Sequence, residues 1–169
     1  MKVFAIVFIA IGLCAVTAGA QKRHSAHRHV KLKTVKREPF DPARDPKADL
    51  TAAIANATAQ RKRIILDVGG EWCGWCRYMD KFFTAHALLS TTRDRNYVWL
   101  KINYSEENEN QAFLSAYPEI EGYPHLFVLN SDGKLLQSQD TSVFERGEVY
   151  SAAAILKFLK DWAPPLDAH

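Results

Sequence analysis

The sequence predicts an α/β domain in which a central mixed β-sheet is covered on both faces by helices. Strand-like apolar runs alternate along the chain with segments whose apolar residues recur at helical spacing. The last two predicted strands are joined by a short turn, so the sheet contains an antiparallel pair. We expect one domain, because the 149 residues that follow residue 20 are too few for two domains of ordinary size.

The first 20 residues have the pattern of a secretory signal peptide. Lys2 supplies a positive start, an apolar core spans residues 3–16, and Ala18-Gly19-Ala20 offers a cleavage site between small residues. The apolar core is short for a membrane span, and an uncleaved anchor is the alternative interpretation. We therefore expect an exported soluble protein, secreted or periplasmic, that is cleaved after Ala20.

Residues 21–45 are predicted to form a disordered basic leader. From Gln21 to Arg37 there are seven Lys and Arg, three His and no acidic residue, whereas fourteen basic residues face nineteen acidic ones from Glu38 onward. Three prolines between residues 39 and 46 then indicate a stiff linker. The leader is either a solvated spacer or a segment that touches an anionic surface or binds metal weakly through its histidines.

The folded domain is expected over residues 46–163, with a C-terminal tail at 164–169. Its first predicted helix is capped by Asp45 and carries Pro46 in the first turn. The apolar residues of this helix share one face: Leu50, Ala53, Ile54 and Ala57. A β-branched run at 64–68, bounded by Arg63 and a Gly-Gly pair, predicts a buried strand.

The remaining elements follow in an alternating order. A helix that opens at the cysteines has Met79, Phe82 and Phe83 on its apolar face. The later predictions are a strand at 97–102, a helix at 108–117, a hairpin of strands 126–130 and 135–138 around Ser131-Asp132-Gly133, and a helix at 152–162.

Cys73-Gly74-Trp75-Cys76, at a predicted junction of strand and helix, carries the chemistry. Two thiols three positions apart form the minimal motif for thiol–disulfide exchange. The third cysteine, Cys14, lies in the signal peptide, so a zinc site would lack two ligands and no metal is expected. A purely structural disulfide is the other alternative, but closing so short a loop removes little chain entropy. A single close pair in an exported protein favours a redox role.

The position of the motif predicts different roles for the two thiols. A thiol at a helix N-terminus faces unpaired N–H groups and the positive end of the helix dipole, which favour the thiolate. Cys73, expected to be the more exposed, is therefore the predicted nucleophile, and Cys76 is predicted to resolve the mixed disulfide. Trp72 and Trp75 are predicted to shield the sulfurs and offer an apolar docking surface, with ordinary packing as the alternative.

Three further features accompany the motif. Asp67 lies six positions before Cys73 in an apolar strand, where a buried carboxylate is costly without a partner, and Lys101 on the next strand is the natural partner. Gly122-Tyr123-Pro124 precedes a strand and suggests a cis turn. Together, ILDVGGEWCGWC, LKIN and EGYPHLFVLNSDGKLL resemble the thioredoxin family in order and spacing over about residues 48–162.

The resemblance implies the thioredoxin-like fold and a role for each matching residue. It implies that Cys73 attacks a substrate disulfide, that Cys76 resolves the product, and that Asp67, tuned by Lys101, takes the proton of Cys76 through water with a raised pKa. The predicted substrate-binding residues are Trp72, Gly74, Trp75, Tyr123 and Pro124, with the Tyr123 backbone pairing to an extended substrate segment. The only redox group expected is the Cys73–Cys76 disulfide, without an added cofactor.

One departure from the family bears on the direction of electron flow. Trp75 stands where thioredoxins carry proline, as in secreted bacterial C-G-W-C variants, and no histidine separates the cysteines, which disfavours a strongly oxidising site. His125 is expected either to restore some positive potential near Cys73 or to be a surface histidine.

The sequence thus predicts an exported thiol–disulfide oxidoreductase, of reductase type, that acts on proteins with disulfides or thiols. A membrane redox partner is expected, and nucleic-acid binding is not. The alternatives are a disulfide isomerase or oxidase of the same fold, and a non-catalytic binding module that presents Trp72, Trp75 and Tyr123 to a partner.

Overall fold

The computed structural model describes residues 38–165 of the 169-residue chain. The predicted signal peptide, most of the predicted leader and most of the predicted tail therefore lie outside the described residues. Within the described part, no helix is both long enough and apolar enough to span a membrane.

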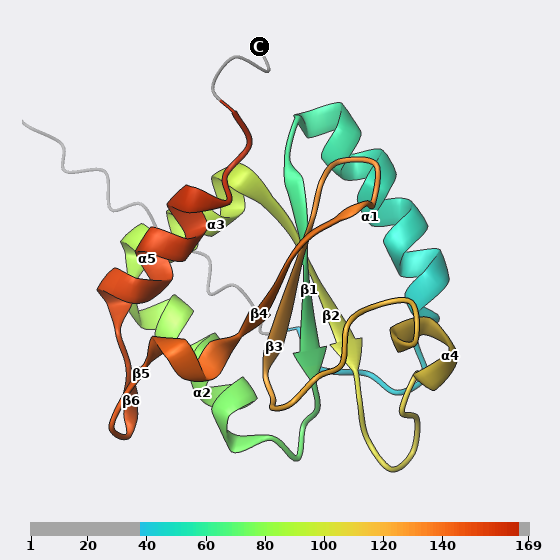
Figure 1. Ribbon diagram of the computed structural model, residues 1–169, viewed down its shortest axis with the longest axis horizontal. Coiled ribbons are helices and arrows are strands. Elements are labelled where there is room, and N and C mark those ends of the chain that lie inside the picture. The colour runs from blue at the N-terminus through green and yellow to red at the C-terminus, as the bar shows by residue number, and fades with distance from the viewer. Residues whose placement is uncertain (1–37, 166–169) are drawn as a thin grey trace, which may run out of the picture. The chain divides into compact units, whose positions relative to one another are not determined.

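A four-stranded mixed sheet forms the centre of the fold (Figure 1). Its strands lie in the order β2-β1-β3-β4, with β1 and β2 parallel and β3 antiparallel to both β1 and β4. The elements in chain order are α1 (Pro46–Gln60), β1 (Arg63–Gly69), α2 (Gly74–Ala85), α3 (Ala87–Asn96), β2 (Tyr97–Asn103), α4 (Gln111–Leu114), β3 (His125–Leu129), β4 (Leu135–Asp140), the 3-10 helix η1 (Thr141–Phe144), β5 (Glu145–Arg146), β6 (Val149–Tyr150) and α5 (Ala152–Asp161).

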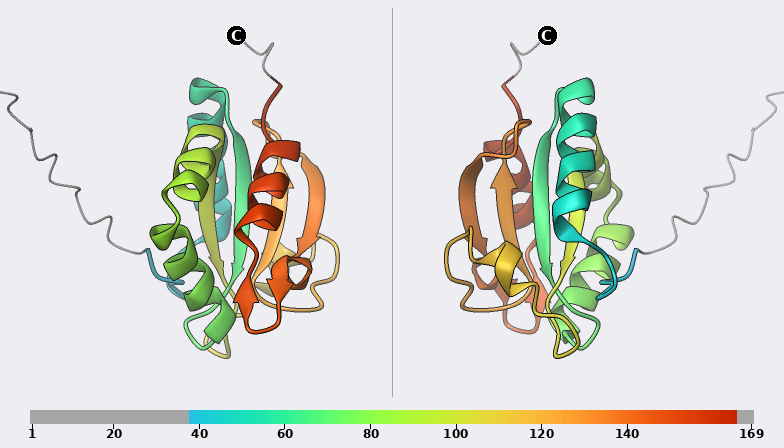
Figure 2. Two further views of the ribbon diagram at one scale, coloured as in Figure 1. Left: turned by 90° about the vertical axis from the view of Figure 1, so that its left-hand side faces the viewer. Right: turned by 90° about the vertical axis from the view of Figure 1, so that its right-hand side faces the viewer.

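Helices cover both faces of this sheet, as the sequence predicts. Ile65 and Val128 belong to a buried cluster with residues of α2, α3 and α5, whereas Ile64 and Leu66 belong to a second cluster with α1 and α4. Successive side chains of a strand point to opposite faces, so the continuous apolar run of β1 fills both clusters. The two views of Figure 2 bring each helical layer to the front in turn.

The predicted start of the first helix is confirmed in detail. The Asp45 carboxylate accepts a hydrogen bond from the backbone N–H of Lys47 at 2.9 Å, and Pro46 occupies the first turn.

β1 and β2 pair in the register Asp67 to Lys101, which places these two charged residues side by side on neighbouring strands. This pairing positions the group of charges described below.

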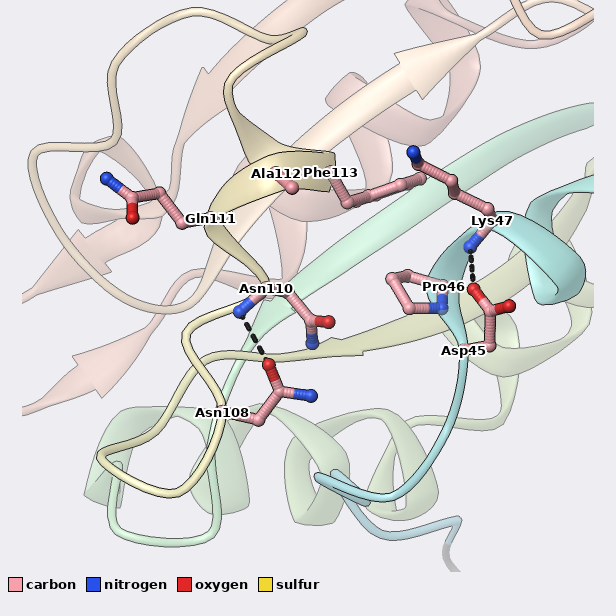
Figure 3. A pocket seen from close by; sticks show the side chains of 8 residues that line it. All are labelled: Asp45, Pro46, Lys47, Asn108, Asn110, Gln111, Ala112 and Phe113. Atoms are coloured by element: carbon pink, nitrogen blue, oxygen red, sulfur yellow. Dashed lines mark hydrogen bonds between the residues drawn. The ribbon is translucent and has the colours of Figure 1, made fainter.

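The predicted helix at 108–117 is wrong over most of its length, because within this range only the short segment α4 forms an α-helix. The backbone of Asn110 is left-handed, with φ of 49°, and the Asn108 side chain accepts a hydrogen bond from the Asn110 N–H at 2.9 Å (Figure 3). Asparagine competes for backbone groups in this way and favours turns over helix. Asn108 and Asn110 line a pocket of about 260 Å³ beside the start of α1.

Other parts of the structure were not predicted from the sequence. The helix α3, the 3-10 helix and the β5–β6 hairpin fill the regions between predicted elements. The packed chain also extends ahead of Asp45, the residue near which the sequence places the start of the domain, because Phe40 is only 2 % exposed. This phenylalanine lies in a buried cluster with Cys73 and Cys76.

Candidate active site

Cys73 and Cys76 form a disulfide at the N-terminus of α2. In the chain, α2 is the element that follows β1 (Figure 1). Cys73 is the residue that caps the helix, and its sulfur accepts a hydrogen bond from the Cys76 N–H at 3.0 Å. This N–H would stabilise a Cys73 thiolate once the disulfide is reduced. Cys73 is the more exposed of the two, as predicted, but only at 4 % against 1 % for Cys76.

Gly69 gives the Cys76 sulfur its place against the end of β1. A Cβ atom at this position would lie 2.6 Å from Cys76 Sγ and 3.2 Å from the Phe40 ring. Real Cβ atoms do not approach other atoms this closely, so any larger residue would push the sulfur or the ring away. Gly74 is the opposite case, because a Cβ there would meet nothing within 4 Å.

Two buried charged residues, Asp67 and Lys101, form a group with the half-buried Asp80. The Lys101 ammonium contacts Asp67 Oδ2 at 3.3 Å and both carboxylate oxygens of Asp80 at 2.8 and 2.9 Å. The Trp99 indole N–H donates to Asp67 Oδ2 at 3.0 Å. The expected pairing of Asp67 with Lys101 is thus present, but Lys101 binds Asp80 more closely.

Burial raises the pKa of the Asp67 carboxyl, and the positive charge of Lys101 only partly opposes the effect. The negative charge of Asp80 raises the pKa further. Asp67 Oδ1 is buried and has no hydrogen-bond partner among the described residues. A buried carboxyl with a raised pKa and a specific charged partner is a candidate functional group.

Trp72, Tyr104 and Tyr123 form an aromatic rim that reaches the cysteine cluster through Tyr123. Trp72 is 56 % exposed, and its indole N–H donates to the Tyr104 carbonyl at 2.7 Å. Tyr123 packs edge-on to Trp72 at 5.6 Å between ring centroids and stacks on Tyr104 at 4.8 Å. Tyr123 also packs against the cluster of Phe40 and the two cysteines.

The other predicted substrate-binding residues occupy different surroundings. Trp75 packs against the cluster of Phe40 and the two cysteines, and its ring also lies 5.6 and 4.9 Å from the rings of Tyr78 and Tyr150. Pro124 is buried, and the peptide bond between Tyr123 and Pro124 is cis, as expected. The two tryptophans therefore belong to different aromatic groups: Trp72 is exposed, whereas the half-buried Trp75 packs on the cysteine cluster.

Both expectations for His125 are wrong. The residue is 4 % exposed, and its Nε2 atom lies 2.8 Å from the Ser138 hydroxyl. Burial lowers the pKa of the imidazole, against a small opposing effect of Asp140. His125 is therefore neutral at pH 7 and supplies no positive potential to the disulfide.

Sequence reasoning missed four residues at or beside the site: Phe40, Asp80, Trp99 and Tyr104. Two of them carried a usable signal. Asp80 follows Cys76 by four positions, one helical turn, and Trp99 precedes Lys101 by two positions on the same strand face. Phe40 offered only its apolar character in a polar, proline-rich segment. Within residues 38–165, no group of three or more His, Cys, Asp and Glu is arranged to hold a metal ion.

Comparisons with known proteins agree with this fold. A family model described as thioredoxin-like matches residues 45–131. The thiol:disulfide interchange protein DsbD of Pseudomonas sp. (strain JR1 / K1) is 28% identical over 137 residues, which cover 80% of this chain and 22% of that protein. DsbD of Colwellia psychrerythraea is 27% identical over 106 residues, 62% of this chain and 17% of that protein. The chain thus spans about a fifth of the length of these relatives.

Solved structures share the fold over nearly their full length. The disulphide isomerase from Xylella fastidiosa Temecula1 superimposes with a TM-score of 0.64 at 24% identity, over 74% of this chain and 96% of that chain. The oxidised C-terminal domain of DsbD from Neisseria meningitidis gives a TM-score of 0.53 at 23% identity, over 70% of this chain and 96% of that chain.

Proposed function

The chain belongs to the thioredoxin-like family, and from this premise we propose that it is an exported thiol–disulfide oxidoreductase of reductase type. One observation carries the proposal: a disulfide at a helix N-terminus, with the Cys73 sulfur accepting the Cys76 N–H beside an exposed aromatic rim. The DsbD relatives, which are named as thiol:disulfide interchange proteins, support the same chemistry.

The proposed reaction moves two electrons from the cysteine pair to a substrate disulfide. In the reduced protein, the Cys73 thiolate attacks one substrate sulfur, a mixed disulfide forms, and the other substrate sulfur leaves as a thiolate. The Cys76 thiolate then attacks Cys73 Sγ, which re-forms the Cys73–Cys76 disulfide and releases the second substrate thiolate. The two released thiolates take up the protons that the cysteines lost. In this proposal no metal, flavin or nucleotide takes part.

Asp67 is the proposed acceptor of the Cys76 proton, through a water molecule. Its raised pKa makes it a stronger base than an exposed carboxylate once it has lost its own proton. Lys101 would keep the ionised form accessible, because its ammonium lies 3.3 Å from Asp67 Oδ2. Asp80 competes for the same ammonium and so favours the protonated state of Asp67.

The open aromatic rim is the proposed docking surface for protein substrates. Trp72 and Tyr123 present apolar area beside Cys73, and an extended substrate segment would pair with the Tyr123 backbone. Gly74 leaves the approach to the disulfide open, since no heavy atom lies within 4 Å of where its Cβ would be. Pro124 would hold the turn that presents this backbone, and Trp75 would support the helix start from within.

We further propose that the protein works in the periplasm or outside the cell and exchanges electrons with a membrane protein. An exported reductant must be re-reduced after each turnover, and a membrane redox partner could carry electrons to that compartment. The predicted signal peptide supports export, and the DsbD relatives support partners that carry thiols or disulfides.

Reduction of insulin by dithiothreitol tests the proposal. The protein should accelerate the reduction, and Cys73→Ser should return the rate to the uncatalysed background. Cys76→Ser should also abolish turnover. When this variant is pre-reduced, freed of dithiothreitol and mixed with insulin, it should accumulate a mixed disulfide between Cys73 and insulin, visible on a non-reducing gel. Phe113→Leu, a change in the cluster on the opposite face of the sheet, serves as the control for folding. No acceleration by the parent protein would favour the binding-module alternative.

A further inference from the structure

We propose that Phe40 is a positioning residue whose ring closes off Cys76, so that external disulfides and thiol reagents reach Cys73 alone. The inference rests on the proposed function, because it concerns which thiol of the pair meets the substrate. It adds a residue that lies ahead of the segment matched by the thioredoxin-like family model.

Phe40 contacts both cysteines and the end of β1. Its side chain is 2 % exposed and lies in one buried cluster with Cys73 and Cys76. Atoms of its ring lie 3.2 and 3.4 Å from the point where a Gly69 Cβ would be, and that point is 2.6 Å from Cys76 Sγ. The ring therefore lies against the same small space that holds the Cys76 sulfur.

The ring also covers the buried charges. Lys101 Nζ lies 3.9 Å from the centre of the Phe40 ring, within the range of a cation–π contact. One side chain thus contacts both the cysteine cluster and the ammonium that pairs with Asp67. Removal of the Phe40 ring would admit water both to the cysteine cluster and to the Lys101 ammonium.

Hydrogen bonds and an ion pair hold the segment that carries Phe40 in place. The Phe40 N–H donates to Glu71 Oε1 at 2.8 Å, and Glu71 lies two residues before Cys73. The Pro42 carbonyl accepts from Asn108 Nδ2 at 2.8 Å, and Arg44 Nε pairs with Asp49 Oδ2 at 2.7 Å. These contacts come from three separate parts of the fold and fix the segment against the domain.

The functional consequence follows from the small difference in exposure between the thiols. Cys73 and Cys76 are both nearly buried, at 4 % and 1 %, so burial within α2 alone gives little basis for choosing between them. Cys73 adjoins the exposed Trp72 on the open side, whereas Cys76 lies between the end of β1 and the Phe40 region. The phenylalanine is thus the part of the shield around Cys76 that the cysteine motif itself does not supply.

Alkylation of Cys76 tests the inference without any need for turnover. We would use the full-length chain with Cys14→Ser and Cys73→Ser, so that Cys76 is the sole thiol, and follow its reaction with iodoacetamide by mass spectrometry. In this reaction a carbon–sulfur bond forms and iodide leaves. Phe40→Ala should raise the rate at least about tenfold, because local access then replaces a larger opening of the fold.

Graded variants keep the test independent of one substitution. Phe40→Leu should retain most of the shield, with a rate within about threefold of the parent, and Phe40→Val should lie between Leu and Ala. If Phe40→Ala does not fold, the order of the parent, Leu and Val variants decides the question. Phe113→Ala is the matched control, because it truncates a buried phenylalanine of the other cluster and should leave Cys76 protected.

The outcomes separate this inference from the proposed function. Equal alkylation rates in the parent and in the Phe40 variants would overturn the role of Phe40, even if the parent reduces insulin. Equal acceleration by Phe40→Ala and Phe113→Ala would also overturn it, since both rates would then report general loosening of the fold. If Phe40→Ala alone speeds the alkylation of Cys76 and the parent does not reduce insulin, the role of Phe40 would be supported and the proposed oxidoreductase activity rejected.

Discussion

Asp67 is the proposed proton acceptor of the site, and its surroundings shift the pKa of its carboxyl. Burial and the Asp80 charge raise the pKa of its carboxyl, while the Lys101 charge and the hydrogen bonds from Trp99 and Lys101 lower it. Burial is the largest of these effects and the pKa is raised, so the folded protein binds a proton at Asp67 more tightly than the unfolded chain does. The stability of the protein must therefore depend on pH through this residue.

We expect the contribution of Asp67 to stability to fall as the pH rises. The unfolded chain loses this proton near pH 3.9, whereas the folded protein holds it to a higher pH, so the loss begins above about pH 3.9 and is complete once the pH passes the raised folded pKa. Asp67→Asn cannot ionise and escapes this loss. The unfolding free energy of the variant, relative to the parent, should increase from pH 4 to pH 8 in urea titrations. A difference that stays flat over this range would contradict the prediction.

The two glycines of the site provide a matched pair of substitutions. Gly69→Ala should cost about 1–3 kcal/mol of unfolding free energy, because its Cβ would lie 2.6 Å from Cys76 Sγ and the neighbours must move. Gly74→Ala adds the same methyl group where nothing lies within 4 Å and should change stability by less than about 0.5 kcal/mol. Urea unfolding of both variants in the oxidised state checks the pair. Similar losses of unfolding free energy in the two variants would contradict the prediction, because they would show that the atoms around Gly69 move aside easily.

Among the elements, those with a strong pattern could be predicted from the sequence, and those shaped by side-chain chemistry could not. The run at 64–68 and the cap at Asp45 specify β1 and the start of α1 by local rules. By contrast, α3 has Leu89 as its only buried residue and shows no apolar stripe, so periodicity gave no sign of it. In the segment before α4, asparagine side chains form hydrogen bonds with backbone groups and hold the chain in a turn, which competes with helix formation.

The cap of α1 offers a test at the scale of an element. Asp45→Ala removes the carboxylate that accepts from the Lys47 N–H, and a lost cap of this kind costs about 1 kcal/mol. Glu119→Ala is the control, because it also removes one negative charge but at an exposed position. The unfolding midpoint in urea should fall for Asp45→Ala and stay close to the parent for Glu119→Ala. Equal shifts would indicate an effect of net charge rather than of the cap.

At the scale of the whole molecule, the candidate site is assembled from four distant parts of the chain. Phe40, the end of β1 with the start of α2, the β2 strand and the turn before β3 all meet around the disulfide. Three of these parts could be located from the sequence because they carry recognisable motifs. Phe40 could not, because its place depends on long-range contacts to Glu71 and Lys101 that no local pattern encodes.

The charges around the disulfide argue for a reducing potential. The helix N-terminus and the Cys76 N–H stabilise a Cys73 thiolate, but no histidine separates the cysteines, and His125 is neutral because burial lowers its pKa. Nearby, the Lys101 ammonium contacts the carboxylates of both Asp67 and Asp80, so its positive charge is directed to these groups rather than to the cysteines. A thiolate gains little in such surroundings, so the reduced state is not strongly favoured over the disulfide.

We therefore expect the Cys73–Cys76 couple to have a reduction potential near −270 mV, roughly that of thioredoxin. Equilibration of the full-length chain with dithiothreitol buffers, followed by trapping of free thiols and mass spectrometry of the peptide that holds both cysteines, measures it. The oxidised protein should also unfold at a higher urea concentration than the reduced one, and a Cys73→Ser, Cys76→Ser double variant should show no such redox dependence. A potential of about −120 to −180 mV would instead place the protein with oxidases and isomerases, because each 30 mV corresponds to about 1.4 kcal/mol between the two states.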